Sequence, residues 1–232
     1  MKKFTAIFVT VFFIIGSVFQ TSTAVSTNSS TALNAKKLTD CFTKTQKADS
    51  LEADQTTKTV TKSASIVINT HAKIENIKKG LKGAITMNMA GTKKELFLSI
   101  NNGKATVYSK DLTGKYKANT MTSSQIGDLD VSRPFNAYIN IIKSNPSLIA
   151  KVNNNKFKLN IPKNKIKDFY SKITGKNVSL SFTNMSVEFE IGSNGYLQTL
   201  VLNESYNSLN KTTTTKFYNY NKKFNIVLPK VS

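Results

Sequence analysis

Residues 81–100, LKGAITMNMAGTKKELFLSI, contain two stretches in which apolar and polar residues alternate, separated by the pair Ala90-Gly91. The apolar positions of the two stretches are Ile85, Met87 and Met89, then Leu96, Leu98 and Ile100. Strict alternation places such side chains on one face of a strand. A glycine-containing pair between two alternating stretches is typical of a hairpin turn. These twenty residues therefore predict an antiparallel β-hairpin with one buried face.

The same pattern extends in both directions along the chain. Residues 51–122 carry further turn signals at hairpin spacing, namely Lys79-Gly80, Asn101-Asn102-Gly103 and Thr113-Gly114, and predict five or six sequential antiparallel strands. Alternation returns near the C-terminus, at Val178, Leu180 and Phe182, at Val187, Phe189 and Ile191, and over 197–202, with final strands expected at 217–220 and 224–228.

Helical spacing of apolar residues interrupts these strands at three places. A helix is expected over 34–47, with the stripe Leu38, Cys41, Phe42 and Thr45. Pro134 and Pro162 stand where two more helices could begin, separated by a short strand at 156–161; the expected ends are Asn145-Pro146 and Gly175. We expect an α+β fold in residues 34–232: one large curved antiparallel sheet, a half-barrel, with helices packed on its concave face.

The N-terminus has the organisation of a secretory signal. Lys2 and Lys3 precede an apolar run at residues 4–19, and Ser22-Thr23-Ala24 suits cleavage after Ala24. The alternative is a transmembrane anchor, but a run of about 16 residues is short for a bilayer, which needs about 20. Cys41, preceded by Leu38-Thr39-Asp40, is not in a lipobox. We expect residues 1–24 to be removed, 25–33 to form a disordered leader, and the remaining chain to be secreted without a lipid anchor.

The charge is strongly positive, +20 for the full sequence. Such a field attracts anionic membranes and anionic wall polymers. Arg133 is the single arginine, whereas specific nucleic-acid readers depend on arginine for bidentate contacts. The composition therefore favours a basic surface over a specific nucleic-acid site.

Catalytic and metal-binding sets are not recognisable in the sequence. His71 is the only histidine, and it lies in the strand-like stretch INTHAKI without a nucleophile motif. One histidine, one cysteine and scattered acids do not make a metal-ligand cluster. Cys41 is expected to be a small buried residue on the first helix. We expect no enzyme activity, no cofactor and no metal, and a monomer.

A curved sheet with helices across it encloses either a filled core or a cavity for an apolar ligand, and the residues alone leave both open. The side chains that could line such a cavity are Met87, Met89, Phe97, Phe135, Tyr138, Phe169 and Phe189. Each has the spacing of an ordinary core residue.

Three segments carry a resemblance to a known group. They are AKKLTDCFTKTQKADSLEA at 35–53, LSINNGKATVYSKDLTGKYK at 98–117, and FYNYNKKFNIVLP at 217–229. In this order the chain resembles a secreted Gram-positive member of the lipoproteins that share the half-barrel fold of the carriers LolA, LppX and LprG. The resemblance spans most of residues 35–229. The chain departs from the group in having no lipobox, and Tyr116 stands where tryptophan is frequent.

The resemblance implies a half-barrel and the binding of a lipid, lipopeptide or other apolar ligand, and it implies no catalytic residues. We therefore expect a secreted, non-enzymatic binding or carrier protein. The alternative is a basic, wall-associated or surface-associated interaction protein with a filled core. A secreted hydrolase with an unrecognised site is the third hypothesis.

Overall fold

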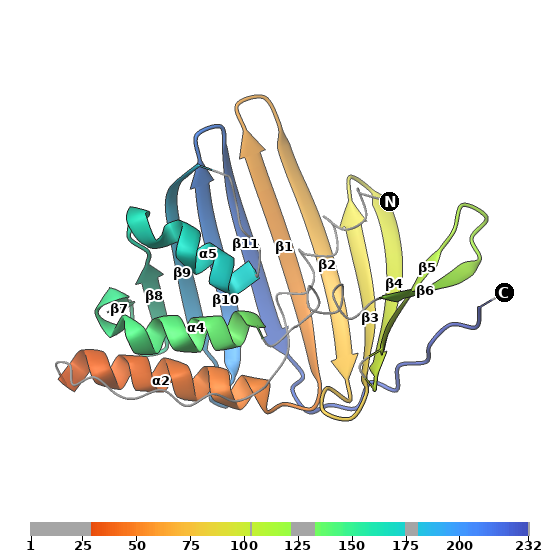
Figure 1. Ribbon diagram of the computed structural model, residues 1–232, viewed down its shortest axis with the longest axis horizontal. Helices are drawn as coiled ribbons and strands as arrows, with labels where there is room; N and C mark the ends of the chain where they lie inside the picture. Colours follow the sequence, from red (N-terminus) through yellow and green to blue (C-terminus); the bar gives the residue numbers. More distant parts are fainter. Residues whose placement is uncertain (1–28, 103, 122–132, 175–180, 232) are drawn as a thin grey trace.

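Strands β1 (Leu51–Thr61) and β11 (Leu209–Tyr218) pair antiparallel along almost their whole lengths, although they lie far apart in the sequence. This pair joins two runs of strands into one sheet of eleven, in the order β6-β5-β4-β3-β2-β1-β11-β10-β9-β8-β7 (Figure 1). The sheet is open, with β6 and β7 as its edges. The computed structural model describes residues 29–102, 104–121, 133–174 and 181–231.

Short turns connect the strands of the first run, which are β1, β2 (Ser65–Glu75), β3 (Leu81–Met89), β4 (Thr92–Asn101), β5 (Lys104–Lys110) and β6 (Tyr116–Met121). Turn residues Gly80, Gly91 and Gly114 all have positive φ, a conformation that glycine adopts without steric cost. Six sequential antiparallel strands confirm the prediction for this region. The second run comprises β7 (Ile149–Lys151), β8 (Lys156–Asn160), β9 (Phe182–Ile191), β10 (Leu197–Tyr206) and β11.

The described α-helices are α2 (Ser29–Gln46), α4 (Arg133–Ser144) and α5 (Ile166–Thr174), with short 3₁₀ turns at η1 (Pro146–Leu148) and η2 (Lys163–Lys165). They contact one another and lie over the second run of strands, with their main strand contacts on β7, β9 and β10 (Figure 1). The α+β half-barrel with helices on its concave face is thus confirmed. None of the helices in the described residues is long and apolar enough to cross a bilayer.

The register places side chains from six strands in one row on the concave face, in the order Thr70, Gln55, Thr215, Leu200, Phe189 and Phe157. Because neighbouring residues of a strand point to opposite faces, this row fixes which positions face the helices. It is apolar on β8–β10 and polar on β11, β1 and β2. The concave face is therefore not uniform along the sheet.

Helix α2 begins at Ser29, before the predicted start at Asn34. The sequence predicts that residues 29–33 belong to a disordered leader, and their helical structure corrects that prediction. Ala35 is buried one turn before Leu38, so the apolar stripe is longer than the sequence pattern suggested. Residues 1–28, which include the predicted signal peptide and its cleavage site, lie outside the described range.

The predicted strand at 224–228 is wrong, because those residues have no regular structure. Asn219, Asn221 and Asn225 have positive φ, which interrupts extended backbone. The carboxyl group of Glu75 instead accepts hydrogen bonds from the backbone amides of Phe224 and Ile226, at 3.1 and 2.9 Å. The last strand is β11, which begins eight residues before the predicted start at 217.

Two further expectations fall outside the described residues. They are the helix stop at Gly175 and the alternation that begins at Val178 and Leu180.

Candidate functional site

The helix-covered part of the concave face is filled by four aromatic side chains, here called the aromatic cluster: Phe42, Phe135, Tyr138 and Phe189. The ring of Phe42 lies 5.3 Å from that of Phe189, edge to face, and 5.6 Å from that of Tyr138, stacked. Phe135 lies 5.7 Å from Phe42. All four are 1% exposed or less. These distances are those of favourable aromatic pairs, so this half is a packed core.

A second apolar surface lies on the same face of strands β2–β5 and is here called the apolar floor. Its buried side chains are Ala72, Ile74, Leu81, Ile85, Met87, Leu96, Leu98, Ala105 and Val107. In Figure 1 no described helix lies over these strands.

Polar side chains separate the two apolar surfaces along the centre of the sheet. Gln55 and Thr215 occupy one row, and Thr57 and Thr213 the next, all 6% exposed or less. Gln55 Nε2 donates to Thr57 Oγ1 at 3.4 Å, but Gln55 Oε1 has no hydrogen-bond partner in the described structure. A buried polar oxygen without a partner is destabilising by about 1–3 kcal/mol. The buried hydroxyl of Tyr138 also has no hydrogen-bond partner in the described structure.

A charged cluster lies at the end of this polar band, near the turn between β10 and β11. Glu204 is 1% exposed; its Oε1 accepts a hydrogen bond from the Tyr206 hydroxyl at 2.7 Å. Glu204 Oε2 accepts no hydrogen bond, but it lies 3.0 Å from Lys211 Nζ, and this ion pair balances its charge. Burial and the nearby Glu204 raise the pKa of Tyr170 to about 12. The same two causes raise the pKa of Tyr206. Both tyrosines therefore stay protonated near neutral pH and act as hydrogen-bonding groups.

The seven predicted cavity residues do not form one group. Phe135, Tyr138 and Phe189 belong to the aromatic cluster, whereas Met87 lies on the apolar floor. Phe97 pairs with Ala84 on the opposite face, where its ring lies 5.8 Å from that of Tyr116.

The remaining two predicted cavity residues, Met89 and Phe169, lie away from the centres of the aromatic cluster and of the apolar floor. Met89 is the last residue of β3 and is 44% exposed. Phe169 is buried on α5 beside a surface pocket.

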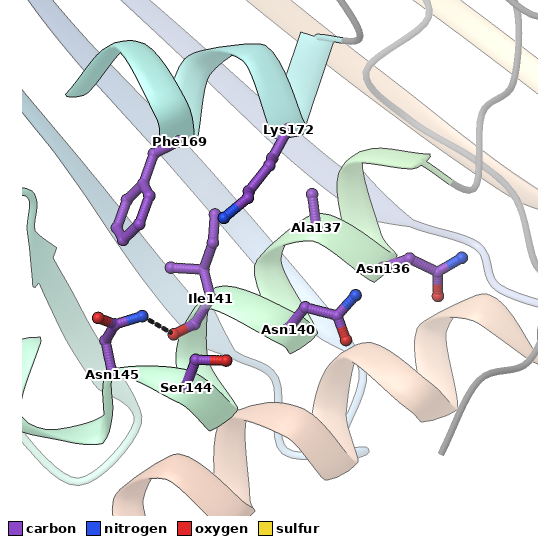
Figure 2. Close-up of a pocket in the computed structure, with 8 residues that line it drawn as sticks. All are labelled: Asn136, Ala137, Asn140, Ile141, Ser144, Asn145, Phe169 and Lys172. Atoms are coloured by element: carbon purple, nitrogen blue, oxygen red, sulfur yellow. Dashed lines mark hydrogen bonds between the residues drawn. The ribbon is translucent and has the colours of Figure 1, made fainter. Parts of the chain in front are cut away.

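This surface pocket, of about 370 Å³, lies between α4 and α5, on the far side of the helices from the sheet (Figure 2). It is lined by Asn136, Ala137, Asn140, Ile141, Ser144, Asn145, Phe169 and Lys172. Its amides are partly engaged, since Asn145 Nδ2 donates to the carbonyl of Ile141 at 3.1 Å. Lys172 lies 2.7 Å from Asp168. A small pocket rimmed by amides is poorly suited to an acyl chain.

His71 lies on the opposite face of the sheet, between two carboxyl groups. Its Nδ1 is 2.8 Å from Asp54 and its Nε2 is 3.2 Å from Glu52. Tyr218 donates its hydroxyl to Asp54 at 2.7 Å. Burial acts to raise the pKa of Asp54, but the hydrogen bonds from Tyr218 and His71 outweigh it and hold that pKa below its usual value. Both nitrogens of His71 face acids, which is the arrangement of a structural histidine.

Within the described ranges no three metal-ligating side chains lie close enough together to hold an ion. Cys41 is buried on α2, as the sequence predicts, and burial raises the pKa of its thiol to about 12. Because the thiolate is the reactive form, this cysteine is unreactive at neutral pH.

The sequence pattern did not single out Gln55, Glu204 or Phe42 as site residues. Glu204 follows Leu200 and Leu202 at even spacing, so alternation could have placed it on the inner face. Gln55 sits among threonines, where no apolar alternation marks either face.

No family model and no curated protein matches this chain in sequence. Among solved structures, LprF from Mycobacterium bovis is similar, with a TM-score of 0.51 and 12% identity, over 86% of this chain and 97% of that one. The Mycobacterium tuberculosis lipoprotein LppX matches at a TM-score of 0.46 and 10% identity, over 86% and 100% of the two chains. At these identities the likeness to LprF shows the fold alone, and that fold is the half-barrel type expected from the sequence.

Proposed function

We propose that the protein is a secreted, non-enzymatic carrier that holds a lipid, lipopeptide or other apolar ligand against the concave face of its half-barrel. The observation that carries this proposal is the apolar floor of β2–β5, over which no described helix lies. The resemblance to the LolA, LppX and LprG group supports the same class of ligand. The signal-like residues 1–24 support export, with cleavage after Ala24.

The polar band beside the floor supports a ligand with a polar head group. Gln55, Thr70 and Met87 are neighbours in one row across β1, β2 and β3. Gln55 Oε1 lacks a donor in the described structure, and a hydroxyl or amide of the ligand would supply one. An acyl chain would then run from this row across Met87 and Leu98. This placement satisfies a buried oxygen and covers apolar surface at once.

The second candidate is a basic, wall-associated or surface-associated protein with a filled core. It is favoured by the aromatic cluster, which leaves little room under the helices. In that case the lysine-rich surface would be the functional feature.

The proposal is tested by native mass spectrometry of the protein purified from its own culture medium, followed by extraction and lipid analysis. The expected result is an apolar ligand bound in stoichiometric amount. The variant Met87→Thr, on the floor, should lose most of that ligand. Phe97→Thr, on the opposite face of the next strand, is the matched control and should retain it. A protein that carries no ligand and does not bind added lipids would contradict the carrier proposal and favour the candidate with a filled core.

A further inference from the structure

The β1–β2, β3–β4 and β5–β6 hairpins turn at the same end of the sheet (Figure 1), and exposed apolar side chains gather there. Nine large apolar side chains are exposed among the described residues, and five of them lie at this end: Val60, Ile66, Val67, Met89 and Leu112. This end, with the adjacent β10–β11 turn, is here called the hairpin rim. Scattered exposed apolar residues need no explanation, but a gathering at one end does.

The β1–β2 hairpin contributes most to the rim because β2 extends past its neighbour β3. The last pair between β2 and β3 is Ile68 with Met89, so residues 65–67 have no partner strand on that side. Ile66 and Val67 point to opposite faces of β2. Val60 lies diagonally across from Val67, since Val60 pairs with Ser65. The tip of the β1–β2 hairpin therefore exposes apolar side chains on both of its faces.

The charge of the rim is strongly positive. Residues 58–68, 87–95, 110–117 and 205–211 contain two acids and eight lysines, namely Lys58, Lys62, Lys93, Lys94, Lys110, Lys115, Lys117 and Lys211.

Both acids of the rim are already engaged. Glu95 lies 3.2 Å from Lys93 and 3.6 Å from Lys110. Asp111 accepts hydrogen bonds from the backbone and hydroxyl of Thr113 within its own turn. Both acids stay ionised, but eight lysines against two acids leave the rim positive.

The opposite end of the β1–β6 run also bears lysines, and Val227, next to the Ile226 amide that Glu75 binds, is exposed there. Its β2–β3 turn carries the exposed lysines Lys78 and Lys79, but the neighbouring Ile77 is partly buried against the core. Val152, in the β7–β8 turn, is an exposed valine away from the rim. The rim therefore differs from the opposite end in the number of exposed apolar side chains that it gathers, five of the nine, and Lys78, Lys79 and Val152 serve as controls.

We propose that the hairpin rim docks on the surface of an anionic lipid bilayer. Val60, Ile66, Val67, Met89 and Leu112 would enter the boundary between head groups and acyl chains, and the surrounding lysines would approach lipid phosphates. Apolar insertion and attraction to anionic lipid are the two contributions that hold peripheral proteins at such a surface. This proposal does not depend on the interior holding a ligand.

Sedimentation with vesicles tests the docking, using the chain from Val25 onward, which retains every described element. Vesicles of equal parts phosphatidylglycerol and phosphatidylcholine are compared with vesicles of phosphatidylcholine alone. The protein should bind the anionic vesicles, and more weakly as ionic strength rises. The variant Ile66→Ser/Val67→Ser should weaken binding by about tenfold or more. Val152→Ser is its control and should bind like the unaltered chain.

The lysine contribution is measured with a second matched pair. Lys58→Gln/Lys62→Gln at the rim should weaken binding several-fold and reduce its dependence on salt. Lys78→Gln/Lys79→Gln removes the same charge at the opposite end and should have a clearly smaller effect. All substituted side chains are exposed, so circular dichroism should show an unchanged fold.

Three outcomes would overturn the proposal. Anionic vesicles that leave the protein in the supernatant would do so directly. Binding that depends on the lysines but not on Ile66 and Val67 would indicate attraction to polyanions in general, wall polymers included. A dimer that dissociates in the Ile66→Ser/Val67→Ser variant would show that the free edge of β2 pairs with a second copy instead.

Discussion

Strands β8–β10 and strands β3–β5 contribute to the same concave face, but their surroundings differ. Beneath α2 and α4, the strand residue Phe189 packs against Phe42 and Tyr138 at ring distances of 5.3 and 5.5 Å. On the other half, Met87 and Leu98 are also buried, yet no described helix lies over their strands. One sheet thus carries a half that the described helices cover and a half over which none of them lies. Ligand exchange is expected where no helix has to be removed.

The comparison would be broken most clearly by one large-to-small mutation in each half. Phe42→Ala should lower the free energy of unfolding by about 4 kcal/mol, because it opens a cavity among rings that cannot close over it. Leu98→Ala on the floor should lower it by about 2–3 kcal/mol. Urea unfolding followed by circular dichroism measures both. Only Leu98→Ala should also weaken binding of an added fatty acid. Equal loss of ligand binding in the two variants would erase the distinction between the halves.

Lys211→Met tests the polar band that separates the halves. Glu204 is fully buried while Lys211 is only partly exposed, so the variant leaves a buried acid without its cation. We expect a loss of about 3 kcal/mol in the free energy of unfolding. Lys158→Met, whose partner Glu188 is well exposed, is the control and should change stability by less than about 1 kcal/mol. Similar effects in both would mean that the Glu204 pair is no more important than a surface pair.

Asp54→Asn, on the convex face, should have the smallest effect. The folded-state pKa of Asp54 lies below its ordinary value. Its contribution is therefore present above the unfolded pKa of about 3.9 and is lost as pH falls through the lower folded value. The side chain is more than half exposed, so the loss at pH 7 should stay under about 1 kcal/mol. Between pH 4 and pH 2 the variant should lose less stability than the unaltered protein, as urea midpoints across pH would show.

Much of this fold could be predicted because local signals agreed with it. Alternation and glycine turns defined β3 and β4, and helical spacing defined α4 and α5. Strand β11 was located only in part, since Thr212–Thr215 place threonines on both faces at the centre of the sheet. There is then no apolar alternation to detect.

The candidate site was less accessible to prediction. Phe97 lies between Leu96 and Leu98 in the alternation, so its outward position was readable from the sequence, but its size favoured an interior place. Gln55 and Glu204 are buried by their position on the concave face, and polar residues carry no local mark of such burial. Which half the helices cover depends on contacts between distant segments, such as Phe42 with Phe189. Periodicity within one element contains no information about those contacts.

The most direct measurement is to map a bound ligand onto the two halves. A fatty acid with a photoactivatable diazirine near the end of its chain is bound to the chain from Val25 onward, irradiated, and located by peptide mass spectrometry. Labelling should fall on the floor strands, around Met87 and Leu98, and an excess of unmodified fatty acid should abolish it. Labelling confined to the pocket between α4 and α5 or to the convex face, or labelling that excess fatty acid does not reduce, would contradict a carrier that uses the concave floor.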